Sequence, residues 1–86
     1  MPKISEFFGI SIYMYFREHG VPHFHARYGS EEVVLAIDDL SVLGGQLSPR
    51  ALGLVTEWAS QHQTELADNW DRARQHRQLV SIEPLK

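Results

Sequence analysis

Hydrophobic and polar residues alternate along the first half of the chain with the period of two that is typical of strands. The clearest segments are residues 10–17, 23–28 and 32–38. In the last of these, apolar residues occupy both faces, which indicates a central place in a sheet. Two shorter segments, 4–8 and 41–43, have the same character and are candidates for further strands. The pattern therefore predicts a strand-rich first half.

The second half has the three- and four-residue spacing of an amphipathic helix. Ser48 is a favourable N-cap, and Pro49 suits the first helical position because it lacks the N–H that a helix start leaves unpaired. An apolar stripe follows, made of Leu52, Val55, Ala59, His62, Leu66, Trp70 and Ala73. The stripe predicts one long helix over about residues 49–75. An extended segment over residues 79–85 would follow it.

Strands followed by a helix are typical of a segregated α+β domain. The chain has 86 residues, enough for one modest core and too few for two. We therefore predict that residues 1–86 form a single two-layer domain. Its antiparallel sheet would contain three to four strands within about residues 4–43. One face of that sheet would pack on the single long C-terminal helix.

Composition and charge narrow the function classes. The chain is 43% hydrophobic and 22% charged, which is typical of a globular domain, and it has no cysteine for a disulfide or a thiolate metal site. Its apolar runs are too short for a membrane span and its N-terminus lacks the core of a secretory signal, so we predict a cytoplasmic protein. The net charge of −3 argues against binding of nucleic acid by electrostatic attraction over the whole domain surface.

One face of the hairpin predicted from residues 10–17 and 23–28 concentrates side chains that carry chemistry. Period-two alternation collects two phenols, two guanidiniums and two imidazoles there: Tyr13, Tyr15, Arg17, His23, His25 and Arg27. That set suits the binding or cleavage of a phosphodiester, the binding of a metal ion, or contact with an acidic partner. The sequence leaves these three chemistries open.

Short motifs along nearly the whole chain resemble a known family. They include Pro22-His23-Phe24-His25, Asn69-Trp70 and Ile82-Glu83-Pro84-Leu85. These motifs are similar to those of the small bacterial family catalogued as domain of unknown function 4160. The resemblance implies a stand-alone bacterial protein, commonly encoded beside a second short protein (domain of unknown function 2442) in an arrangement that looks like a toxin–antitoxin pair. It implies no catalytic residues, so the site residues are assigned from their own chemistry.

The function that we favour from the sequence is the toxin-like member of such a two-gene module, acting on RNA or on a partner, with metal-independent endoribonuclease activity as the form that its residues suit. RNA cleavage without a metal needs a general base, a general acid and cations near the phosphate, and histidine and arginine supply these groups. The predicted catalytic residues are Arg17, His23, His25 and Arg27. The predicted binding residues are Tyr13, Tyr15 and His19. This prediction assigns no metal or other cofactor, and no membrane contact.

Two alternatives remain open. In the first, the polar face is a non-enzymatic interface that binds a protein partner from the neighbouring gene, a nucleic acid, or a second copy of the chain. In the second, His23 and His25 bind a metal ion, because alternate strand residues stand about 6.5–7 Å apart at Cα and can share one ion. A catalytic zinc site usually has a third protein ligand in addition to two histidines. His19 and Asp38 are the candidates for it.

Overall fold

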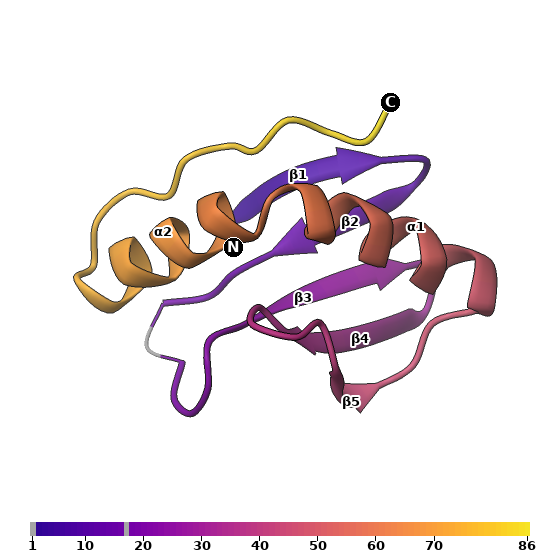
Figure 1. Ribbon diagram of the computed structural model, residues 1–86, viewed down its shortest axis with the longest axis horizontal. Coiled ribbons are helices and arrows are strands. Elements are labelled where there is room, and N and C mark those ends of the chain that lie inside the picture. The colour runs from indigo at the N-terminus through magenta and orange to yellow at the C-terminus, as the bar shows by residue number, and fades with distance from the viewer. Residues whose placement is uncertain (1, 17) are drawn as a thin grey trace.

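The computed structural model of the protein describes residues 2–16 and 18–86, and its five strands precede two helices along the chain (Figure 1). The elements are β1 (Lys3–Phe7), β2 (Ile10–Tyr13), β3 (His23–Tyr28), β4 (Glu31–Ala36), β5 (Val42–Gly45), α1 (Pro49–Gln61) and α2 (Gln63–Arg74). The predicted α+β class, with strands first and helical structure second, is confirmed. No helix in the described part of the chain is both long and apolar enough to cross a membrane.

The sheet is an antiparallel meander in the order β1-β2-β3-β4-β5. It has five strands, so the prediction of three to four was too low. Both short outer segments are paired: Phe7 of β1 lies opposite Ile10 of β2, and Val33 of β4 lies opposite Gly45 of β5. The two-residue turn between β1 and β2 has positive φ angles at Phe8 (50°) and Gly9 (80°), the backbone that a tight hairpin requires.

The main strands are shorter than the pattern suggested. β2 ends at Tyr13 rather than at residue 17, and β4 ends at Ala36 rather than at 38. Residues 14–16 and 18–22 instead belong to the connection between β2 and β3, and this connection carries Glu18. Arg17, one of the predicted catalytic residues, lies outside the described residues.

The core lies between one face of the sheet and the two helices, which run across that face (Figure 1). Period-two alternation places its strand residues as expected: Ile10, Ile12, Phe24, Ala26, Val33 and Leu35 are fully buried, and so is Met14 just after β2. The helices contribute Val55, Trp58, Leu66 and Trp70 to the same core. The opposite sheet face carries the polar residues, so the predicted separation of faces holds.

The helical half is divided, and the prediction of one long helix over 49–75 was wrong. His62, with φ −132° and ψ 24°, ends α1 and precedes α2. A tertiary contact lies next to the break: the Gln63 side chain donates hydrogen bonds to the carbonyls of Ile37 (2.8 Å) and Asp38 (2.9 Å), just after β4. These bonds fix the start of α2 against the end of the sheet.

The C-terminal segment, residues 79–86, is extended but forms no strand. It lies along the outer side of β1 (Figure 1) and makes one backbone bond to it, from the Ile82 N–H to the Ile4 carbonyl (2.8 Å). Side chains add two more anchors, since Ser5 Oγ donates to the Ile82 carbonyl and Trp58 Nε1 donates to the Glu83 carbonyl. The segment therefore closes one edge of the two-layer core.

Candidate metal centre

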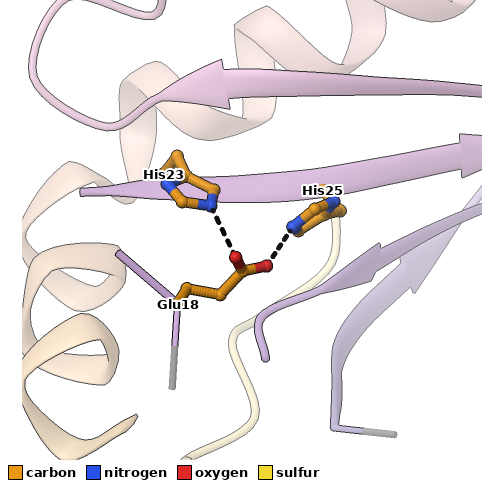
Figure 2. A group of neighbouring side chains, drawn as sticks. All are labelled: Glu18, His23 and His25. Carbon is orange, nitrogen blue, oxygen red and sulfur yellow. Dashed lines mark hydrogen bonds and ion pairs between the residues drawn. The ribbon is translucent and has the colours of Figure 1, made fainter. Parts of the chain in front are cut away.

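Three side chains converge at the start of β3 (Figure 2). The Glu18 carboxylate lies between two imidazoles, with Oε1 at 2.8 Å from His25 Nε2 and Oε2 at 3.5 Å from His23 Nε2. The ligand atoms of all three residues lie within 4.8 Å of one another. We call Glu18, His23 and His25 the Glu–His–His cluster.

Local structure accounts for this convergence. β3 alternation places both imidazoles on the same side of the strand, with ring centroids 5.5 Å apart. The connection before β3 bends at Gly20, whose φ of 91° is a conformation that glycine adopts without strain. That bend brings Glu18, which precedes β3 by several residues, back to the two rings (Figure 2).

The other nitrogen of each ring also faces an oxygen. His23 Nδ1 lies 2.8 Å from the Val21 carbonyl, and His25 Nδ1 lies 3.1 Å from Glu32 Oε2. A carbonyl can only accept, so the hydrogen bond at His23 requires an N–H on Nδ1. In the neutral form of that ring, Nε2 then has no hydrogen and presents a lone pair to Glu18.

Aromatic rings enclose the cluster. Tyr15 stands edge-on to His25, with ring centroids 4.6 Å apart, and Tyr13 stacks on Tyr15. Trp70 of α2 packs against His23 at 5.0 Å. The imidazole side chains are consequently only 10% (His23) and 13% (His25) exposed. Burial, with a further contribution from the Glu32 charge, raises the pKa of Tyr15 above its usual 10.0, so this phenol is neutral at physiological pH.

The structure gathers some of the sequence-predicted site residues and separates others. His23, His25 and Tyr15 are in contact, and Tyr13 adjoins them. Arg27 lies further along β3, half exposed, with Nε 3.6 Å from Glu32.

Two other candidates lie outside the cluster. His19 is exposed and lines a neighbouring cleft. Asp38, a candidate third ligand, is exposed and is not part of the cluster.

Two functional candidates were missed from the sequence, Glu18 and Glu32. The position of Glu32 could have been predicted from the sequence. Antiparallel pairing of the strands places Glu32 opposite Arg27, which lies two residues after His25 on the same side of β3. The position of Glu18 could not have been predicted in this way, because it depends on the path of the connection between β2 and β3. In place of His19 or Asp38, the third candidate ligand is therefore Glu18.

The cluster has the donor set and spacing of a small metal site. Ligands around a tetrahedral zinc ion with bonds of about 2.0–2.1 Å stand about 3.3 Å apart. The Glu18–His distances are 2.8 Å from Oε1 and 3.5 Å from Oε2, and the ligand atoms of the three residues all lie within 4.8 Å of one another, which is the range in which one ion can contact all three. Carboxylate oxygen and imidazole nitrogen both suit zinc and neighbouring transition metals.

Comparison with known proteins gives a family and no function. No curated protein and no solved structure matches the chain. The family model described as "Domain of unknown function (DUF4160)" matches residues 9–71, well over half of the chain. The matched region contains the Glu–His–His cluster and its outer partner Glu32. The chain therefore belongs to the DUF4160 family of domains of unknown function.

Proposed function

We propose that this protein binds one divalent transition-metal ion, with zinc as the first candidate, through Glu18, His23 and His25. Two imidazoles and a glutamate form one of the three-ligand sets of catalytic zinc sites, which keep a fourth position for water or substrate. At that position an ion supplies Lewis-acid chemistry. This proposal revises the sequence-based prediction, which assigned no metal.

One observation carries the proposal: both Nε2 atoms point at the same carboxylate while both Nδ1 atoms face separate oxygens. With the hydrogens on Nδ1, two nitrogen lone pairs and a carboxylate meet at one point and repel each other unless a cation lies between them. Histidines that bind metal ions almost always donate their other N–H to a carbonyl or carboxylate, as His23 and His25 are placed to do with Val21 and Glu32.

Protons compete for the same position. Imidazole binds a metal ion in its neutral form, and so metal affinity falls as the pH is lowered. Without an ion, a proton on Nε2 of His25 satisfies the 2.8 Å contact with Glu18. We therefore expect zinc affinity to decrease between pH 7.5 and 5.5.

Metal binding is measured on the whole chain, stripped with chelator and then titrated with zinc by calorimetry and thermal unfolding. The wild type is expected to bind one zinc ion per chain. Its unfolding free energy should rise by about 2.7 kcal/mol at a free zinc concentration a hundredfold above the dissociation constant. His23→Ala, His25→Ala and Glu18→Gln should each weaken binding by at least tenfold. His76→Ala is the matched control, because this exposed histidine lies outside the cluster.

Two results would contradict the proposal. One is a wild type that takes up no zinc, nickel or cobalt and keeps the same unfolding temperature when these are added. The other is equal zinc affinity in wild type and all three cluster variants. Circular dichroism of each variant separates lost binding from lost fold. Glu18→Gln is the safest variant, because Glu18 lies in a connection rather than in the core.

Metal-free acid–base catalysis is the second candidate, and it retains the sequence-based prediction of a toxin-like ribonuclease. It is favoured by the hydrogen-bonded chain Glu18–His25–Glu32, because a carboxylate beside an imidazole is a typical proton-transfer pair. Arg27, one of the two arginines predicted to lie near the phosphate, is beside Glu32, and the carboxylate offsets its charge. Cleavage of RNA in the presence of chelator would favour this candidate over the metal centre.

A further inference from the structure

An open cleft of about 250 Å³ borders the Glu–His–His cluster. It is lined by Glu18, His19, Gly20, Trp70 and Arg74. Glu18 belongs to both the cleft and the cluster, and Trp70 packs against His23 from the helix side. A ligand in the cleft is therefore adjacent to the carboxylate that would hold the ion.

The cleft contains a guanidinium that is not neutralised. Arg74 is the last residue of α2 and is exposed, and no ion pair among the described residues includes it. Two other arginines have side-chain partners: Arg72 donates to Asn69 Oδ1 at 3.1 Å, and Arg27 lies beside Glu32. The helix dipole stabilises a positive charge at the C-terminal end of α2, where Arg74 lies.

We infer that this cleft binds the phosphate group of a phosphate ester, with one oxygen on the metal ion and others on Arg74. The inference rests on the proposed metal function. A divalent ion beside Glu18 leaves a local charge of about +1, and Arg74 raises it to about +2, which complements a phosphate ester. The planar guanidinium accommodates two phosphate oxygens side by side, and the exposed imidazole of His19 provides a further donor.

The test compares phosphate binding with and without metal. Zinc-loaded and zinc-free wild type are titrated calorimetrically with inorganic phosphate, methyl phosphate and acetate. The same titrations are made with Arg74→Gln, Arg74→Lys and the control Arg77→Gln. Arg77 is also exposed but follows α2 and does not line the cleft. Zinc affinity is measured separately for every variant.

We expect methyl phosphate to bind the zinc-loaded protein and not the zinc-free protein. Arg74→Gln should weaken this binding by about tenfold or more, and Arg74→Lys should restore it only in part, because an ammonium cannot make the bidentate contact. Arg77→Gln should bind as the wild type does, and zinc affinity should stay unchanged in both Arg74 variants.

Three results would overturn the inference while leaving the metal function intact. They are phosphate binding that is indifferent to Arg74, acetate binding as tight as methyl phosphate binding, and binding of inorganic phosphate with exclusion of methyl phosphate. Absence of zinc binding by the wild type would overturn the metal function itself, together with this inference. The separate zinc titration thus distinguishes the two failures.

Discussion

At the scale of single residues, buried polar groups hold parts of the chain that the sheet and helices do not connect. Asn69 on α2 is 1% exposed, and its amide pairs with both backbone groups of Val80, accepting the N–H at 2.9 Å and donating to the carbonyl at 2.8 Å. It also accepts a bond from Arg72. Among the described residues, no buried side-chain nitrogen or oxygen lacks a partner.

Removal of the Asn69 amide should therefore destabilise the fold. Asn69→Ala leaves the Val80 backbone groups unpaired where the C-terminal segment meets α2, which should cost about 1–3 kcal/mol of unfolding free energy. Asp68→Ala is the matched control, because Asp68 is exposed on the same helix. The measurement is the urea midpoint of each variant. Equal midpoints would show that water replaces the amide at no cost.

At the scale of elements, α2 is held by its apolar face and by the contact at its first turn. Leu66 is fully buried in the core, while the Gln63 amide reaches the Ile37 and Asp38 carbonyls. The helical pattern would place Gln63 on an exposed face, where its substitution should be silent. In the structure it joins the helix to the end of β4, so Gln63 is not a neutral control for this helix.

Leu66→Ala should destabilise the protein by about 2–5 kcal/mol, because it opens a cavity in the core. Thr64→Ala, at an exposed position of the same helix, should change stability by less than about 0.5 kcal/mol. Gln63→Ala should fall between the two, since it removes two hydrogen bonds to backbone carbonyls. Guanidinium unfolding of the three variants ranks them. A Leu66→Ala midpoint equal to that of Thr64→Ala would contradict the observed helix face.

At the scale of the whole molecule, one core supports a candidate site at its rim. The helices and the C-terminal segment cover one face of the sheet, and the cluster occupies the start of β3, where the β2–β3 connection and α2 meet. The net charge of −3 is unfavourable for long nucleic acids, so an anionic ligand must be attracted locally. A bound divalent ion and Arg74 would provide that attraction.

The two candidate functions predict different activities for the intact chain. Under the metal proposal, any cleavage of RNA or of a model phosphate ester requires zinc loading, and chelator abolishes it. Under metal-free acid–base catalysis, cleavage persists in chelator, depends on pH between 5.5 and 8.5, and falls by about 10²–10⁴-fold in His23→Ala or His25→Ala. Growth of cells that express the chain alone, or together with its neighbouring gene, tests the toxin-like role. Absence of both RNA cleavage and growth arrest would leave that role without support.

The sequence by itself determined the features that depend on local periodicity. Alternation predicted that Ile10, Ile12 and Phe24 face the core, and it put His23 and His25 on one side of their strand. The cap and first turn at Ser48-Pro49 were also predictable, and Ser48 Oγ accepts a hydrogen bond from the Ala51 N–H. These features are local because neighbouring residues and the 2.0 and 3.6 periods decide them.

Only the tertiary structure decided the strand count, the break at His62 and the composition of the site. Outer strands form when a partner edge is available, and α2 begins where Gln63 meets the end of β4. Glu18 reaches the histidines through the path of a connection, and Arg74 lines the cleft beside Glu18 because α2 packs across the sheet. Such contacts between distant segments depend on how whole elements pack, and no local period encodes them.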